Sequence, residues 1–218
     1  MKVIKQTKSL TEQAYEILLD KICVGELESG MRLNQDNLAK DLDISRQPVN
    51  SAISILKSNG FVEETGRRGV VVSPITSAHL NSIYEFRSAI EPLAVQLAAD
   101  RKPSSADRDA VKILERGWNA VNSGNLNEQV QADFEFHSLI YGWTQNSSLI
   151  NAMKLNWNHI RRGMCIILGE GDYPPKAWDE HERMIMSLLK GHVPVAVTEM
   201  KEHIENAKKI TISLMQNQ

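Results

Sequence analysis

A short β-prone segment, residues 61–72, separates two helical regions of this chain and limits the folds open to it. Phe61–Thr65 and Val70–Val72 are rich in β-branched or aromatic residues, and the tip between them reads Gly-Arg-Arg-Gly. Glycines that flank a short turn are typical of a β-hairpin. We therefore expect one small hairpin, with helices building the rest of the fold.

Three helices are expected before the hairpin. The first follows Ser9, which with Glu12 has the form of a capping box, and its apolar residues recur at helical spacing. A shorter helix is expected at residues 35–42, and a third begins near Arg46 with Pro48 in its first turn. Three short helices, a tight turn between the last two and a hairpin together outline a winged helix-turn-helix.

The sequence after the hairpin is helical throughout. Pro74 ends the second strand and Thr76 can cap the next helix, which places a domain joint at residues 73–76. Helices are expected at about residues 77–100, 105–123, 126–143, 148–168, 175–191 and 194–215, with a loop at residues 169–174. Long helices with short links indicate an antiparallel bundle. The fold class is thus mostly α: a winged helix-turn-helix at residues 1–75 and an all-α antiparallel helical bundle at residues 76–218.

Net charge alone does not indicate a nucleic-acid binder. The chain has 25 basic and 27 acidic residues, a formal charge of −2, whereas nucleic-acid-binding domains usually carry a basic surplus. Residues 1–75 hold equal numbers of basic and acidic side chains. Their cations, however, gather on the N-terminal arm, the start of the third helix and the hairpin tip. We therefore expect a polarised face that binds DNA weakly away from its target sequence.

Cysteine usage and hydropathy indicate a cytoplasmic protein. Cys23 and Cys165 are too few and too far apart for a disulfide scaffold, and neither belongs to a Cys-x-x-Cys pair. The N-terminus lacks the apolar stretch of a signal peptide. No run approaches the ~18 apolar residues that a membrane span needs. We expect reduced thiols, a cytoplasmic location and no membrane partner.

The start of the third helix carries side chains suited to reading DNA. In a helix-turn-helix this helix lies in the major groove, and its first residues contact base edges. Those positions hold Ser45, Arg46, Gln47 and Asn50. Arginine suits guanine, glutamine and asparagine suit adenine, and a hydroxyl at a helix N-terminus suits a phosphate. At the hairpin tip, Arg67, Arg68 and Gly69 are expected to enter a minor groove or contact the DNA backbone. The alternative is a helical protein-interaction module with solvated arginines.

Four spaced motifs run through residues 10–72: Gly25-Glu-Leu-x-x-Gly30-x-x-Leu33, Leu38-Ala39-x-x-Leu42-x-Ile44-Ser45-Arg46-x-Pro48-Val49, Leu56-x-x-x-Gly60-Phe61-Val62 and Gly69-x-x-Val72. In this pattern the segment resembles the GntR family of bacterial transcription regulators. The resemblance implies a homodimer bound to double-stranded DNA at a pseudo-palindromic operator, and it favours repression. The chain departs from the family at Asn50–Ile53, where Arg-Glu-Ala-Leu is typical, and at Ser54, where a further arginine is common. We therefore expect altered DNA contacts and more reliance on dimerisation.

A second group of residues has the spacing of a metal site. Asp133 and His137 are four residues apart, so both project from one face of one helix, and His181 and His203 lie on the last two expected helices. One carboxylate and three imidazoles suit a divalent ion such as Zn²⁺ or Ni²⁺. Octahedral coordination would leave two positions for water or a bidentate acid. Spacing alone leaves open an ordinary ion pair between Asp133 and His137. The remaining histidines are expected to be ordinary hydrogen-bonded or solvated residues: His79, His159 and His192.

Further motifs follow in the helical half: Phe86-Arg87-x-x-x-Glu91, Leu97-Ala98-Ala99, Asp133-x-x-x-His137, Asn146, Glu180-His181 and His203-Ile204. They are similar to the FCD ligand-binding domain of the same family, in its shorter, six-helix branch. The resemblance implies that residues 76–218 bind an effector and dimerise, with the metal held by Asp133, His137, His181 and His203. It also places Arg87 at the effector cavity, whereas a surface or interhelical salt bridge with Glu91 is the alternative. Further candidates for the same cavity are Asn158, Arg161 and Arg162.

Three functions fit these patterns. The first is a DNA-binding transcription regulator, not an enzyme, whose operator binding responds to a small carboxylic acid held at the metal. The second is a metal-dependent enzyme acting on a small organic acid, although four protein ligands crowd a catalytic ion and no side chain has a persuasive general-base placement. The third is an interaction protein with a purely structural metal. We expect the first, most simply as a repressor.

Overall fold

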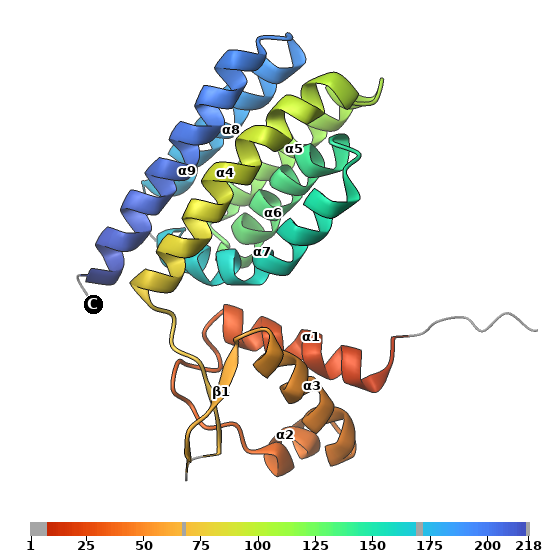
Figure 1. Ribbon diagram of the computed structural model, residues 1–218, viewed down its shortest axis with the longest axis vertical. Coiled ribbons are helices and arrows are strands. Elements are labelled where there is room, and N and C mark those ends of the chain that lie inside the picture. Colours follow the sequence, from red (N-terminus) through yellow and green to blue (C-terminus); the bar gives the residue numbers. More distant parts are fainter. Residues whose placement is uncertain (1–7, 67–68, 169–171, 217–218) are drawn as a thin grey trace, which may run out of the picture. The chain divides into compact units, whose positions relative to one another are not determined.

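The computed structural model describes residues 8–66, 69–168 and 172–216 of the 218-residue chain. The chain divides into two compact units, Met1–Ile75 and Thr76–Gln218. The described residues are mostly helical and contain one two-stranded sheet (Figure 1), so the predicted fold class is confirmed. No described helix is both long and apolar enough to span a membrane.

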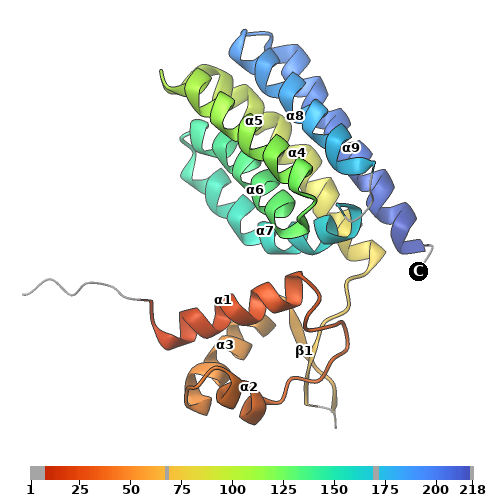
Figure 2. The same cartoon turned by 180° about the vertical axis from the view of Figure 1, so that it is seen from behind.

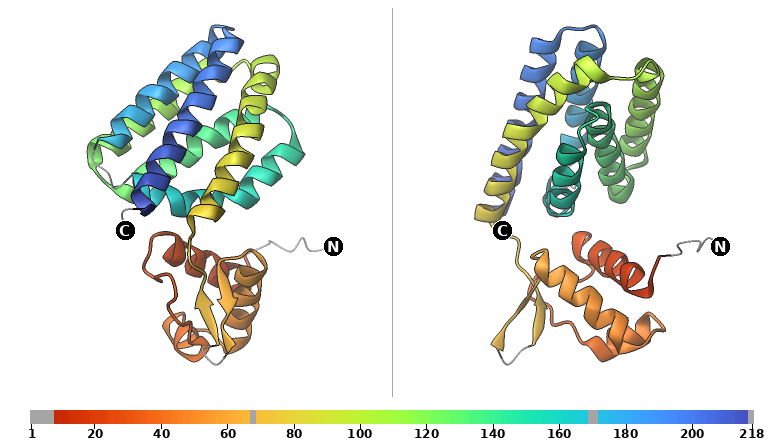
Figure 3. Two further views of the ribbon diagram at one scale, coloured as in Figure 1. Left: turned by 60° about the vertical axis from the view of Figure 1, so that its left-hand side comes forward. Right: turned by 45° about the vertical axis from the view of Figure 1, so that its right-hand side comes forward.

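The first unit is a winged helix-turn-helix, as predicted. Its elements are α1 (Leu10–Cys23), α2 (Gln35–Asp41), α3 (Arg46–Ser58), β1 (Val62–Glu64) and β2 (Val70–Val72). The two strands run antiparallel (Figure 3), and Val62 is paired with Val72 in their register. Its core combines apolar side chains from the three helices and the hairpin, among them Leu18, Ala39, Val49, Leu56 and Val72.

Local sequence sets the ends of these helices. The capping box predicted at the start of α1 is confirmed: the Glu12 N–H donates to the Ser9 hydroxyl, and the Ser9 N–H donates to the Glu12 carboxylate. The Asn34 side chain caps α2 by accepting from two backbone N–H groups. Asp43 has a φ of 52°, in the left-handed region, within the tight turn between α2 and α3. This turn is followed directly by α3, whose first residues are exposed.

The second unit is a bundle of the helices that the sequence predicted. They are α4 (Ser77–Arg101), α5 (Ala106–Ser123), α6 (Leu126–Trp143), α7 (Ser147–Ile167), α8 (Tyr173–Leu189) and α9 (Val193–Gln216). Helix α4 packs most extensively on α9, and α8 lies alongside α9 (Figures 1 and 2). Helix α6 contacts α4, α5 and α7. Its buried face is therefore a place where side chains of several helices can meet. Three tryptophans of this unit are buried: Trp143, Trp157 and Trp178.

The joint between the two units has the local structure that was predicted. Thr76 is the N-cap of α4, and its hydroxyl accepts a hydrogen bond from the His79 N–H. Helix α4 continues through Pro92, so a single element runs from the joint into the core of the bundle.

Helix α8 begins earlier than predicted. The sequence indicated a loop at residues 169–174, but α8 starts at Tyr173, with Pro174 and Pro175 in its first turn. The first N–H groups of a helix have no intrahelical acceptors, so prolines there cost the helix no hydrogen bond. The part of the expected loop at residues 169–171 lies outside the described residues.

Candidate functional site

Four side chains from three helices converge on one buried point of the Thr76–Gln218 unit. Asp133 and His137 lie one turn apart on α6, His181 lies on α8 and His203 lies on α9. One potential ligand atom from each lies within 4.8 Å of those from the other three, and all four side chains are buried. These four residues are called the cup below.

The atoms that face one another in the cup are mainly Nε2 nitrogens. His181 Nε2 lies 3.2 Å from His203 Nε2 and 3.6 Å from Asp133 Oδ1. His137 Nε2 lies 3.7 Å from Asp133 Oδ2 and is buried without a hydrogen-bond partner. A buried polar atom with no partner is costly, and a metal ion would satisfy it. The cup therefore has both the donor set and the unmet requirement of a divalent metal site.

Two glutamates hold the opposite edges of two cup histidines. Glu180 Oε2 lies 2.8 Å from His203 Nδ1, and Glu91 Oε2 lies 2.8 Å from His137 Nδ1. A histidine that ligates a metal usually has such a partner on its other ring nitrogen, which fixes the nitrogen presented to the ion. Sequence reasoning missed both roles. Glu180 precedes a cup residue in the chain but contacts a different one, on α9, which only the packing of the helices reveals.

Burial disfavours the charged form of His181, the cup histidine that neither glutamate contacts. Desolvation lowers the pKa of His181 well below its usual value, and the neighbouring His203 and His137 lower it further. The His181 ring stacks on Phe136, with centroids 4.0 Å apart and 17° between the ring planes. A neutral imidazole has the free lone pair that metal ligation requires.

Arg87 forms a buried ion pair with Glu91, four residues later on α4. The expected alternative partner is therefore present, but the pair lies neither at the surface nor between helices. Burial opposes ionisation of Glu91, yet the charges of Arg87 and His137 outweigh it and lower the pKa of this carboxyl. Burial likewise opposes the charge of Arg87, but Glu91 outweighs it and raises the pKa of the guanidinium. Arg87 is thus committed to Glu91, which in turn contacts the cup.

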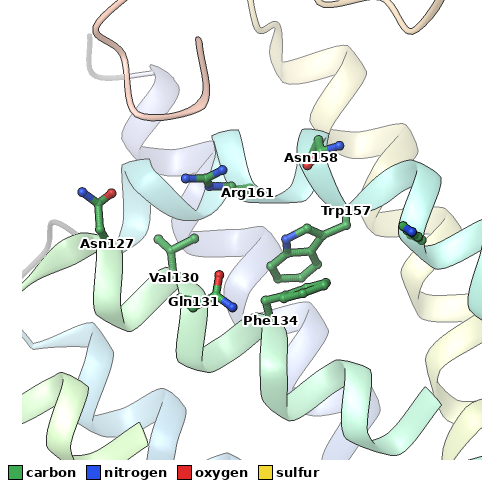
Figure 4. A pocket seen from close by; sticks show the side chains of 8 residues that line it. Asn127, Val130, Gln131, Phe134, Trp157, Asn158 and Arg161 are labelled. Carbon is green, nitrogen blue, oxygen red and sulfur yellow. The ribbon is translucent and has the colours of Figure 1, made fainter. Parts of the chain in front are cut away.

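Two of the three predicted effector-binding residues line a cavity whose lining does not include the third, Arg87. Asn158 and Arg161 line a cavity of about 230 Å³ between α6 and α7 (Figure 4). Neither Arg87 nor any cup residue is among the residues that line it. On α7 the fully buried face includes Ile160 and Met164, and Asn158 and Arg161 project from a different face of the helix. The shared role of the three residues in effector binding stays a prediction.

The other three histidines stand outside the cup. His79 Nε2 lies 3.2 Å from His159 Nδ1, a contact between α4 and α7. Desolvation lowers the pKa of His79, and the charge of Arg162 lowers it further. His192 is exposed. These are the hydrogen-bonded and solvated environments that the sequence analysis predicted for them.

The residues predicted to read DNA lie at the exposed start of α3: Ser45, Arg46, Gln47 and Asn50. Arg46 Nε lies 2.9 Å from Asp36 Oδ1 on α2, and both side chains are largely exposed. An exposed ion pair contributes little to stability, so Arg46 can exchange this partner for a base or phosphate. Gly69 precedes β2 with a φ of 72°. Arg67 and Arg68 lie outside the described residues.

Two protein-family models match the chain. One, described as the FCD domain, matches residues 82–206 and contains the whole cup. The other, described as bacterial regulatory proteins of the gntR family, matches residues 10–72 and contains α1 to α3 and the hairpin. Each match falls within one of the two compact units.

Named relatives of the chain are transcription regulators. YdhC of Bacillus subtilis, an uncharacterised HTH-type transcriptional regulator, is 27% identical over 198 residues, which cover 88% of this chain and 84% of YdhC. The gluconate operon transcriptional repressor of Bacillus licheniformis is 25% identical over 167 residues, 76% of this chain and 67% of the repressor. The solved structure of McbR/YncC from E. coli has the same fold, with a TM-score of 0.80, 22% identity, and coverage of 97% of this chain and 99% of that one.

Proposed function

Because the chain belongs to the GntR family of bacterial regulatory proteins and carries an FCD domain, we propose that it is a repressor controlled by a metal-bound carboxylate. The protein is a DNA-binding transcription regulator, not an enzyme. The name of one relative, a gluconate operon transcriptional repressor, supports repression. In this proposal residues 1–75 read DNA, and residues 76–218 bind metal and effector and form the homodimer.

The observation that carries the proposal is the cup. Its carboxylate and three imidazoles would hold a divalent ion, Zn²⁺ or Ni²⁺, because these are the ligands that such ions prefer. The bound ion would supply a Lewis acid with open positions for a bidentate carboxylate. Glu91 and Glu180 would keep the Nε2 atoms of His137 and His203 directed into the site. Arg87 takes part through Glu91 and not as a direct contact of the effector.

An effector changes DNA affinity only if it binds one arrangement of the protein better than another. Helix α4 offers a covalent connection for this coupling. It begins directly after the joint, capped by Thr76, and it carries Glu91 in contact with His137. A change in the position of His137 on effector binding would therefore act on the helix that follows the DNA-binding unit.

The exposed start of α3 would read DNA in the major groove. The hydroxyl of Ser45 makes no capping hydrogen bond, which leaves it available for a phosphate. The next side chains would contact base edges: Arg46, Gln47 and Asn50. The hairpin tip would contact the backbone or a minor groove through Arg67, Arg68 and Gly69. A homodimer would place two such units on the half-sites of a pseudo-palindromic operator.

Fluorescence anisotropy with DNA from the chain's own promoter region tests the DNA-binding half. We expect binding at low salt. The logarithm of the association constant should fall linearly with the logarithm of the salt concentration. Arg46→Gln removes one base contact and is expected to weaken binding by about 5- to 150-fold. Arg108→Gln, which changes an exposed arginine of α5, is the matched control and should leave affinity unchanged. Salt-insensitive or absent binding would contradict the proposal.

The same assay tests the regulatory half. A panel of small carboxylic acids is added to the protein–DNA complex with Zn²⁺ or Ni²⁺ present. We expect at least one acid to release the DNA from the unmodified protein but not from His181→Ala. His192→Ala, which changes an exposed histidine outside the cup, should respond like the unmodified protein. Equal release from His181→Ala would show that the cup does not hold the effector.

A further inference from the structure

Helices α6 and α7 enclose two adjoining cavities between them. One has a volume of about 230 Å³ and the other about 260 Å³. They share three lining residues, Phe134, Lys154 and Trp157, and so form one continuous depression. It is called the α6–α7 groove below. No cup residue lines either cavity.

The floor of the groove is aromatic. The rings of Phe134 and Trp157 lie against each other between the two helices, with centroids 4.7 Å apart and 40° between the planes (Figure 4). On one side the lining is mostly apolar and includes Ile150 and Met153. On the other side it carries the side-chain amides of Asn127, Gln131 and Asn158. A flat apolar group fits the first half, and a hydrogen-bonding group fits the second.

Two cationic side chains line the groove. Lys154 and Arg161 lie seven residues apart on α7, two turns along one face, with Trp157 between them. Two cations beside an aromatic floor complement an anion that is attached to an apolar ring.

We propose that the α6–α7 groove is a second small-molecule site, separate from the cup, which binds an aromatic monocarboxylate. The ring lies on Phe134 and Trp157, and the carboxylate binds Lys154 and Arg161. Each cavity exceeds the ~150 Å³ that holds one benzene molecule in a protein core. The site goes beyond the metal-bound effector, since it contains no metal-ligating residue of the cup.

Tyr141 relates the groove to the cup. Its side chain lines the apolar half of the groove, and its ring centroid lies 6.2 Å from that of His137. A ligand in the groove would thus contact a side chain that packs beside a cup residue.

Isothermal titration calorimetry of the full chain with phenylacetate tests the proposal. We expect saturable binding with a dissociation constant of about 1 mM or lower. Phenylacetamide, which keeps the ring but has no charge, should bind at least about 10-fold more weakly to the same unmodified protein. This comparison requires no variant. Absence of phenylacetate binding, or equal binding of the acid and the amide, would overturn the proposal.

A double substitution locates the site. Lys154→Gln with Arg161→Gln should weaken phenylacetate binding at least about 10-fold. The matched control, Arg108→Gln with Lys112→Gln on the exposed face of α5, should leave it unchanged. Circular dichroism confirms that each variant is folded. Unchanged binding in the Lys154/Arg161 variant would overturn the proposal. Metal content, measured on the same samples, tests the cup independently, because a chain that binds no divalent ion can still bind phenylacetate in the groove.

Discussion

Glu180 and Glu91 show how single side chains outside a metal site can set its geometry. Each glutamate lies 2.8 Å from the Nδ1 atom of a cup histidine, on the side away from the other ligands. The ring therefore presents Nε2 to the site without having to select between two orientations. The loss of such a partner commonly lowers metal affinity by about 10- to 100-fold, and we expect an effect in this range for either glutamate.

Glu180→Gln tests this contribution. The substitution keeps the size of the side chain but removes the negative charge beside His203, so metal affinity should fall by about 10- to 100-fold. Competition with a chromophoric chelator measures the change. Glu202→Gln is the matched control, because Glu202 is the exposed neighbour of His203 on α9. Equal losses of metal affinity in the two variants, or no loss in either, would contradict this role of Glu180.

Gly117 shows a steric requirement at the same scale. A Cβ atom at this position of α5 would overlap the ring of Trp178, which is buried in the bundle. Gly117→Ala should therefore destabilise the bundle, by about 1–3 kcal/mol for an overpacked core. Urea unfolding followed by tryptophan fluorescence measures it. The comparison is Gly142→Ala on α6, where a Cβ meets no atom. Gly142→Ala should stabilise the helix by about 0.5–1 kcal/mol. A loss of stability of the same size in both variants would contradict the steric account.

At the scale of elements, the ends of the helices depend on single capping residues. The Asn125 side chain accepts hydrogen bonds from two backbone N–H groups at the start of α6, the helix that carries two of the cup residues. Asn125→Ala should cost about 1 kcal/mol in the free energy of unfolding. Asn122→Ala, at an exposed position within α5, should not be destabilising. Metal affinity should be unchanged, because the cup begins two turns beyond the cap. Chemical denaturation and chelator competition on both variants check the two expectations.

Periodicity and capping signals predicted the helices but not how they face one another. Asp133 and His137 were predictable as a pair because four residues make one helical turn. Contacts of Glu91 with His137, and of Glu180 with His203, depend on how α4, α6, α8 and α9 pack. No spacing within one segment encodes them. For the same reason, spacing along α7 does not reveal that Asn158 and Arg161 line a cavity between α6 and α7.

At the scale of the molecule, the two compact units should respond differently to metal. An ion that binds only the folded cup stabilises it by about 2.7 kcal/mol when its free concentration is 100 times the dissociation constant. Removing the ion with a chelator should therefore lower the unfolding temperature of the Thr76–Gln218 unit and leave the other unit unchanged. Differential scanning calorimetry with and without Zn²⁺ measures this effect.

Two histidine variants provide the controls for this experiment. His203→Ala removes a cup ligand and should abolish the zinc-dependent shift of the bundle, whereas the exposed His192→Ala should retain it. A full shift in His203→Ala would mean that the stabilising ion binds elsewhere. A shift in the unfolding of the winged helix-turn-helix would contradict the assignment of the ion to the bundle.

Because Arg87 and Glu91 are four residues apart on α4, their ion pair can form in the isolated helix before the bundle exists. The two charges then enter the core together, as one electrically neutral unit. A pair divided between two helices would require each charge to lose its water separately as the helices met. Contacts that are close in sequence also form sooner than distant ones. We therefore expect α4 to form this ion pair before it packs against the other helices of the bundle. The spacing of the two charged residues thus favours an order of assembly in which α4 forms first.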